Sequence, residues 1–323
     1  MPDTKKKIAF AGSESLPEEY QAKIAAAVPD YDLLDLSKNP SDEEIAACEI
    51  LFGHVKPDII KKMPRLKWVH AHTAGVEMFL NPETRLSNDI ILTNSSGAFG
   101  ISIAEHMLTV TLMLLRNTVS YLTQQREHTW KSIDTRVRNL HDCTVTVVGL
   151  GDIGGRYAQL CHALGAQVNG VVRTVRADKP QYVHRLFTAD RLGEAIKNAH
   201  VVALALPGTG ETAGILSSEH LKSMRQGAYI VNVGRGSAID QDAMTELLQS
   251  GHLGGAALDV TVPEPLPATN PLWDMPNVII TPHVSQGGYD NVLELITDRF
   301  TRYLKDYING RPFGRVVDRD AGY

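Results

Sequence analysis

The sequence predicts an α/β protein built on two doubly wound parallel sheets. Short runs of β-branched and apolar residues alternate with helical segments along most of the 323 residues, and this alternation is typical of parallel sheets covered by helices. A glycine-rich stretch between a strand and a helix, Thr144–Gly154, begins a second such series. The length is sufficient for two domains.

The first series spans residues 6–93 and predicts a small parallel sheet covered on both faces. Pro17 and Ser41 stand where helices are expected to begin. The expected strands are Lys7–Ala11, Asp32–Leu36, Glu49–Gly53, Lys67–Ala71 and Ile90–Asn94, and the helical segments between them are 17–28, 41–48 and 57–62.

One loop of this half, Thr73–Glu77, contains small residues directly after a predicted strand. Ala74 and Gly75 would leave backbone N–H groups accessible, which suits a carboxylate or carbonyl oxygen. An ordinary strand-to-helix turn has the same composition, so the residues alone leave both interpretations open.

The segment Ile101–Leu115 is apolar on almost every side, which predicts a helix buried between layers or domains. Ser102 and Glu105 have the spacing of a capping box at its start. We expect this helix to lead from the first domain into the second. The polar segment 124–141, with Trp130 inside it, predicts a surface excursion that could contact a partner.

The glycine-rich stretch has the spacing G-x-G-x-x-G in a strand–turn–helix context, which favours dinucleotide binding. Gly149 would allow the tight turn, Gly151 the approach of a pyrophosphate, and Gly154 close packing of helix on strand. The pyrophosphate would then lie on free N–H groups at the helix N-terminus. The alternative is a glycine-rich turn without a ligand.

The second series continues to Thr281. Its expected strands after Thr144–Val148 are Gln167–Val172, Val201–Leu206, Ala228–Val233, Gly255–Val260 and Val278–Thr281, and its expected helices are 155–164, 191–198, 218–224 and 241–250. A long amphipathic helix, 288–308, is then expected to return to the first domain.

The end of the strand Gln167–Val172 bears on the choice of dinucleotide. An acid there would bind the adenosine ribose 2′-OH of NAD(H), but the chain has Arg173, Thr174 and Arg176. Arginine binds phosphate bidentately, so these residues favour the 2′-phosphate of NADP(H), with NAD(H) as the second choice. The alternative is that the arginines are solvated loop charges.

Three polar residues follow three predicted parallel strands, at the sheet edge where open α/β proteins bind ligands. Arg235 could hold a carboxylate, and His283 could donate a proton to a carbonyl oxygen and take it back in the reverse direction. Glu264 near His283 would stabilise the imidazolium form. With a dinucleotide supplying hydride, Arg235, Glu264 and His283 predict interconversion of 2-oxo and 2-hydroxy acids.

Composition narrows the choice of partners. A net charge of −5 gives no electrostatic reason to expect nucleic acid or an anionic membrane, and the longest apolar stretch is too short to span a bilayer. The twelve His are scattered without metal-ligand spacing, so no metal is expected. Three distant cysteines predict buried free thiols and, with an N-terminus unlike a signal peptide, a cytoplasmic location.

These motifs together resemble the D-isomer-specific 2-hydroxyacid dehydrogenase family, most of all its NADPH-preferring glyoxylate/hydroxypyruvate reductase members. The resemblance rests on Val147–Gly154, Ile230–Gly236, Ala257–Val260 with Pro263–Leu266, and Thr281–His283. It implies a Rossmann cofactor domain, residues 99–285, inserted in a flavodoxin-like substrate domain, residues 1–98 plus 286–323, and a homodimer.

The resemblance also assigns roles to residues. Arg235, Glu264 and His283 correspond to the catalytic set, and Ala74, Gly75 and Val76, with Arg235, to the substrate-binding set. The implied cofactor-binding residues are Gly149, Gly151, Asp152, Ile153, Gly154, Arg173, Thr174, Arg176, Leu206, Pro207, Thr212, Val233, Gly234 and Asp259.

Several alternatives stay open at this point. The same fold could serve as a non-catalytic NAD(P)-sensing protein, or the enzyme could use NAD(H). Formate dehydrogenases of this superfamily usually have Gln where Glu264 stands, which argues against that activity. The sequence does not determine which 2-oxo acid is the substrate, how strictly NADP is preferred, or the physiological direction.

Overall fold

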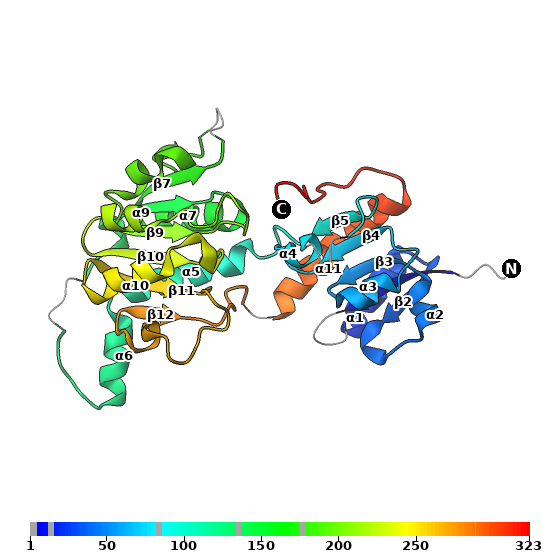
Figure 1. The fold of residues 1–323 in the computed structure, drawn as a ribbon, viewed down its shortest axis with the longest axis horizontal. Coiled ribbons are helices and arrows are strands. Elements are labelled where there is room, and N and C mark those ends of the chain that lie inside the picture. The colour runs from blue at the N-terminus through cyan, green and yellow to red at the C-terminus, as the bar shows by residue number, and fades with distance from the viewer. Residues whose placement is uncertain (1–4, 12–15, 82–85, 134–136, 175–178, 288) are drawn as a thin grey trace. The chain divides into compact units, whose positions relative to one another are not determined.

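The computed structural model describes residues 1–323 except 1–4, 12–15, 82–85, 134–136, 175–178 and 288. The chain forms two compact units (Figure 1). The first unit comprises residues 1–98 and 288–323, and the second comprises residues 99–287. Each unit is described by itself.

The first unit contains a five-stranded parallel sheet in the order β2-β1-β3-β4-β5, a doubly wound order of the flavodoxin-like type. Its strands are β1 (Lys6–Ala11), β2 (Tyr31–Asp35), β3 (Cys48–Gly53), β4 (Trp68–Ala71) and β5 (Ile91–Asn94). Its helices are α1 (Glu18–Ala27), α2 (Asp42–Ala46), α3 (Pro57–Lys61), α4 (Glu77–Leu80) and α11 (Tyr289–Ile308).

Both faces of this sheet are covered. On one face, Phe300 of α11 stacks on Phe52 of β3, with ring centroids 4.1 Å apart, and Trp68 of β4 lies 5.2 Å from the same Phe300 ring. On the other face, α4 contributes the wholly buried Phe79 to a separate apolar cluster. Each fully buried aromatic ring contributes about 1.5–3 kcal/mol to the free energy of folding, so α11 is an integral part of this unit despite its distance along the chain.

The second unit contains a seven-stranded parallel sheet in the order β12-β11-β10-β9-β6-β7-β8. This is the Rossmann order extended by one strand. The order in which the chain adds strands changes direction between β6 and β9, and ligands bind at such a point in open α/β sheets. The strands are β6 (Thr144–Val148), β7 (Gln167–Val172), β8 (Arg185–Thr188), β9 (Val201–Leu204), β10 (Ala228–Asn232), β11 (Leu253–Leu258) and β12 (Val278–Ile280).

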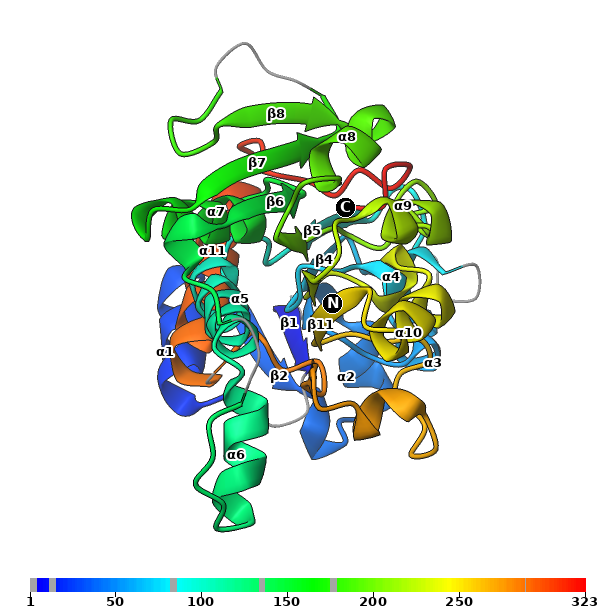
Figure 2. The same ribbon diagram turned by 90° about the vertical axis from the view of Figure 1, so that its left-hand side faces the viewer.

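Helices cover this sheet as well. Its helices are α5 (Gly100–Leu115), α6 (Thr118–Arg126), α7 (Asp152–Ala163), α8 (Leu192–Ile196), α9 (Ser218–Ser223) and α10 (Gln241–Gln249). The α5 helix packs on α7 and on β10 and β11, while α8, α9 and α10 share one apolar cluster with the strands. Figure 2 shows α6 projecting away from the body of the unit.

The predicted fold class is confirmed, whereas one local prediction is wrong and one strand was missed. The α5 helix begins at Gly100 with Phe99 as N-cap and no side-chain cap, so Ser102 lies inside the helix and the capping box does not form. The strand β8 was not expected, because Arg185–Thr188 is short and half exposed. The expected surface excursion at 124–141 is largely exposed where it is described, with Trp130 fully accessible, and its first residues belong to α6, which continues to Arg126.

Other local predictions are confirmed. Ser41 caps α2 in a reciprocal capping box with Glu44, as a serine three residues before a glutamate favours. Cys48, Cys143 and Cys161 are buried free thiols.

Within the part of the chain that is described, no helix is both long enough and apolar enough to cross a membrane.

Candidate active site

The glycine-rich turn joins β6 to α7 and depends on two of its glycines for packing. Gly149 has a φ of +95°, a conformation that side chains rarely adopt. A Cβ atom on Gly154 would lie 1.9 Å from the Gly149 carbonyl oxygen, so only glycine permits the helix to begin this close to the strand.

Gly151 is different, because a Cβ atom there would meet no heavy atom within 4 Å. It is exposed and forms the N-cap of α7, so the space beside it is open to a ligand. Asp152 and Ile153 begin the helix, and Asp152 accepts a hydrogen bond from Arg156 at 2.9 Å. The turn therefore offers a helix N-terminus without a side-chain cap, which is the arrangement that binds a pyrophosphate.

Arg173 and Thr174 are exposed just past the end of β7. Arg173 Nη2 lies 3.3 Å from Glu211 Oε1, and Glu211 belongs to the loop that follows β9. The sequence analysis did not predict this ion pair. Glu211 could have been noticed as a carboxylate in the loop after β9, the strand that neighbours β6 on the side opposite β7. Arg176 lies outside the described residues.

The loop after β9 is closed by its own hydrogen bonds. Thr212 Oγ1 donates to the Pro207 carbonyl oxygen at 2.7 Å and accepts from the Thr209 N–H at 2.9 Å. A Cβ atom on Gly234 would lie 2.6 Å from the Leu206 carbonyl oxygen. This loop and the turn after β10 are thus in direct backbone contact.

Arg235 is held in that turn by the side chain of Asn232. Asn232 Oδ1 accepts from the Gly234 N–H at 3.1 Å, and its Nδ2 donates to the Arg235 carbonyl oxygen at 2.9 Å. On the other side, a Cβ atom on Gly236 would lie 2.3 Å from the Thr261 carbonyl oxygen. The backbone of Arg235 is therefore fixed while its side chain is half buried.

Glu264 and His283 form a hydrogen-bonded pair. His283 Nδ1 lies 3.0 Å from Glu264 Oε2, and their side chains are 45% and 40% exposed. His283 has a φ of +54°, which is uncommon for a non-glycine residue and characteristic of functional sites. A carboxylate at Nδ1 leaves Nε2, the other ring nitrogen, available for proton transfer.

Asp259 holds the loop that carries His283. Its buried carboxylate accepts from Thr281 Oγ1 at 2.6 Å, from the Val284 N–H at 2.9 Å and from the Ser285 N–H at 3.1 Å. Burial alone would raise the pKa of Asp259, but these hydrogen bonds outweigh burial and lower it. The side chain expected to contact a cofactor is therefore engaged in fixing the loop after β12.

Thr281 also lies beside α5, because its Oγ1 is 3.4 Å from His106 Nε2. Neither Thr281 nor Asn232 was singled out by sequence reasoning. Asn232 could have been noticed as a polar residue at the end of an apolar strand that leads into the Gly-Arg-Gly turn.

The structure brings the three predicted catalytic residues to one edge of one sheet. They follow β10, β11 and β12, which are adjacent, and Glu264 and His283 are in contact. Val233, which directly follows β10, is buried. The glycine-rich turn follows β6 at the same edge, because all seven strands are parallel.

In the first unit, side-chain hydrogen bonds also hold the loop after β4 in place. Thr73 Oγ1 lies 3.1 Å from His54 Nε2, and Asn94 Nδ2 donates to the Ala74 carbonyl oxygen at 2.7 Å. The side chain of Val76 is wholly buried, so Val76 can offer a ligand only its backbone. Ala74 and Gly75 are half exposed.

Comparison with known proteins identifies the family. Residues 108–285 match the family model described as D-isomer specific 2-hydroxyacid dehydrogenase, NAD binding domain. The chain belongs to the D-isomer specific 2-hydroxyacid dehydrogenase family. Its members named dehydrogenases and reductases are oxidoreductases, and this chain is an enzyme of that class.

Relatives of this family member include two glyoxylate/hydroxypyruvate reductases. Reductase A of Citrobacter koseri is 29% identical over 305 residues, 93% of this chain and 94% of the relative. Reductase B of Pectobacterium carotovorum is 30% identical over 243 residues, 74% of this chain and 75% of the relative.

Solved structures of family members are similar over nearly the whole chain. The D-isomer specific 2-hydroxyacid dehydrogenase of Xanthobacter autotrophicus Py2, in complex with NADPH and MES, has a TM-score of 0.86 at 26% identity and covers 99% of this chain and 100% of its own. The NADPH-dependent glyoxylate/hydroxypyruvate reductase of Sinorhizobium meliloti, in complex with NADP and sulfate, has a TM-score of 0.85 at 28% identity, with the same coverage.

Proposed function

We propose that this chain reduces a small 2-oxo acid, such as glyoxylate or hydroxypyruvate, to the D-2-hydroxy acid with NADPH, and catalyses the reverse reaction with NADP. The observation that carries the proposal is the Glu264–His283 pair, 3.0 Å apart, at the sheet edge that also holds the glycine-rich turn and Arg235. Family membership and the named reductases among the relatives support it.

The residues of the second unit fit a dinucleotide. The open space beside Gly151 and the uncapped start of α7 would hold the pyrophosphate, with Asp152 and Ile153 beside it and Gly149 and Gly154 shaping the turn. Arg173, Thr174 and Arg176 would hold the 2′-phosphate. We place Leu206, Pro207, Thr212, Val233, Gly234 and Asp259 along the remainder of the nucleotide.

When bound, the nicotinamide supplies the hydride that goes to C2 of the oxo acid. The chain must then provide a proton for the carbonyl oxygen, and His283 donates it from Nε2. Glu264 accepts the Nδ1–H of His283 and stabilises the imidazolium before the proton leaves. Arg235 holds the substrate carboxylate with paired N–H groups, which orients C2; in the reverse direction His283 takes the hydroxyl proton.

The finer features are proposals as well. Residues 99–285 would form the NAD(P)-binding domain, and residues 1–98 plus 286–323 the substrate-binding domain, in which the backbone of Ala74, Gly75 and Val76 binds the substrate carboxylate. We also propose a cytoplasmic homodimer. Exposed apolar side chains on and after α6, namely Tyr121, Leu122 and Trp130, support a contact between copies of the chain.

The test is steady-state oxidation of NADPH and NADH with a panel of 2-oxo acids. We expect turnover with glyoxylate or hydroxypyruvate and a higher kcat/KM with NADPH than with NADH. An absence of turnover across the panel, with nucleotide binding intact, would instead favour an NAD(P)-sensing protein. Arg173→Asp should shift the kcat/KM ratio toward NADH, and an unchanged ratio would refute the phosphate role of Arg173.

A further inference from the structure

A cavity of about 650 Å³ lies in the second unit, away from the proposed active site. It is lined by the starts of β10 and β11 and by the end of α5, so it opens at the amino ends of the strands. The catalytic residues follow the carboxyl ends. The five residues of β10 separate the two edges by roughly 16 Å at the usual rise per residue, so this cavity is a separate site.

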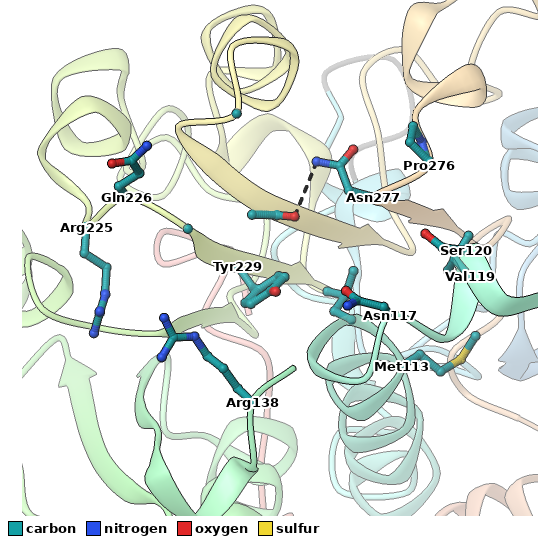
Figure 3. A pocket seen from close by; sticks show the side chains of 14 residues that line it. Met113, Asn117, Val119, Ser120, Arg138, Arg225, Gln226, Tyr229, Pro276 and Asn277 are labelled. Carbon is teal, nitrogen blue, oxygen red and sulfur yellow. Dashed lines mark hydrogen bonds between the residues drawn. The ribbon is translucent and has the colours of Figure 1, made fainter. Parts of the chain in front are cut away.

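Two arginines dominate the charge of this cavity. Arg138, which follows α6, and Arg225, which precedes β10, both line it. Figure 3 shows the Arg138 side chain extending toward the side of the cavity where Arg225 lies, with the Tyr229 ring beside Arg138. None of the described residues that line the cavity is acidic, so two like charges are held near each other without a carboxylate between them, which is unfavourable.

The hydrogen bonding of His200 leaves Arg225 with a second unfavourable neighbour in addition to Arg138. Its Nδ1 accepts from the Thr144 N–H at 3.0 Å, so the neutral ring carries its proton on Nε2. Arg225 Nη1 lies 2.5 Å from that Nε2, where a donor meets a donor. Burial first, and then Arg225 and Arg138, lower the pKa of His200 to about 4, so the ring is neutral at neutral pH. The other neutral tautomer would make Nε2 an acceptor for Arg225, but it would place a proton on Nδ1 and break the hydrogen bond from the Thr144 N–H.

Neither guanidinium group has a carboxylate partner elsewhere in the described ranges. The remaining walls are mixed. The Asn117, Gln226 and Asn277 side chains supply amide groups, and Met113 and Pro276 supply apolar surface. A volume near 650 Å³ is within the range of small-molecule sites, and a few convergent polar groups on an apolar wall are typical of them.

We propose that this cavity binds a small polyanion, a molecule with two or more phosphate or carboxylate groups, between Arg138 and Arg225. Guanidinium groups bind both kinds of oxyanion bidentately. An anion placed there accepts the Arg225 N–H that faces His200 and neutralises the repulsion between the arginines. The site is independent of the proposed reaction, because none of its residues follows the carboxyl end of a strand.

Isothermal titration calorimetry on the full-length protein tests this, with pyrophosphate and citrate titrated separately as the phosphate and carboxylate probes. Each titration is carried out with wild type, Arg138→Gln and Arg225→Gln. Lys222→Gln is the matched control, because Lys222 is exposed and lies three residues before Arg225. Arg173→Gln tests for binding at the nucleotide edge instead.

With saturating NADP present, so that the glycine-rich turn is occupied, we expect one anion per chain with a Kd of about 1 mM or below, from at least one of the two probes. Each cavity arginine variant should weaken binding by about tenfold or more, as the loss of a charge-assisted hydrogen bond does, while Lys222→Gln and Arg173→Gln leave it unchanged. The probe that binds more tightly identifies the anion class.

Three results would overturn the proposal. The first is no binding of either probe, which includes the case in which a second copy of the chain fills the cavity. The second is equal weakening in Lys222→Gln, which would mean non-specific attraction to positive charge. The third is binding that survives both cavity variants or is lost in Arg173→Gln, since the anion would then lie elsewhere.

Discussion

Both sheets of this protein have histidines at the carboxyl ends of their strands, but those of the first unit are largely buried and His283 of the second unit is exposed. In the first unit, His54 follows β3, His70 is the third residue of β4, and His72 follows that strand. Burial lowers the pKa of His54 and of His70, and burial followed by the charge of His54 lowers the pKa of His72 to about 3. In the second unit, His283 is 45% exposed beside Glu264.

The difference shows that position at a sheet edge does not by itself make a histidine catalytic. His70 bonds to Thr93 and Ser95 through its two nitrogens, so both are already committed to the fold. His72 Nε2 is buried without a partner among the described residues. His283 combines a carboxylate at one nitrogen with solvent access, and both features are those needed for the proton-donor role proposed for it.

The largest expected effect comes from His283→Asn. Removing a general acid–base group should lower kcat for 2-oxo acid reduction by about 10²–10⁴-fold, while NADPH binding, followed by nucleotide fluorescence, stays intact. His184→Asn is the control, because His184 is an exposed histidine of the same unit. If His283→Asn kept kcat within a few fold of wild type, the exposed and carboxylate-paired His283 would not be the proton donor, and the comparison with the largely buried histidines of the first unit would say nothing about catalysis.

Arg235→Gln should have the next largest effect. The loss of a charged partner for the substrate carboxylate is expected to lower kcat/KM by about 10–100-fold, mainly through KM for the oxo acid. Initial rates over a range of oxo acid concentrations at saturating NADPH measure this. A loss confined to nucleotide affinity would place Arg235 on the cofactor instead.

Glu264→Gln sharpens the comparison, because it gives His283 a neutral partner. We expect kcat to fall by about tenfold, the effect of losing one charge-assisted hydrogen bond. Glu219→Gln, at an exposed acid of α9, should leave kcat unchanged. An unaltered kcat in Glu264→Gln would show that the carboxylate does not assist His283.

For the first unit we expect the largely buried His72 to affect the pH dependence of stability and not the rate of the reaction. The unfolded chain protonates His72 as the pH falls below about 6.5, whereas the folded protein does so only near pH 3, so the free energy of unfolding declines as the pH drops through that window. Replacing His72 with Gln should remove about 1.4 kcal/mol per pH unit from the slope. Urea unfolding at several pH values, with His184→Gln as control, measures it, and equal slopes would contradict it.

Much of this organisation could be predicted from the sequence, because it depends on local signals. Strand and helix alternation gave the fold class, and the glycine spacing located the turn at Gly149–Gly154, whose packing demands are visible in the backbone. Arg235, Glu264 and His283 could be grouped because parallel strands end at one edge.

The remainder depends on contacts between segments far apart in the chain. Glu211 meets Arg173 across 38 residues, and Asp259 organises a loop 22–26 residues later through Thr281, Val284 and Ser285. The two cavity arginines lie 87 positions apart in the sequence, at residues 138 and 225. No local pattern reports such pairings, since each residue by itself looks like an ordinary surface or loop position.

The most direct test of the central claim is the fate of a labelled hydride. With NADPH deuterated at C4 and hydroxypyruvate as substrate, the account predicts glycerate of the D configuration that carries deuterium at C2, detected by NMR and chiral chromatography, and almost none of it with His283→Asn. Glycerate of the L configuration, product without the label, or equal product from His283→Asn would contradict it.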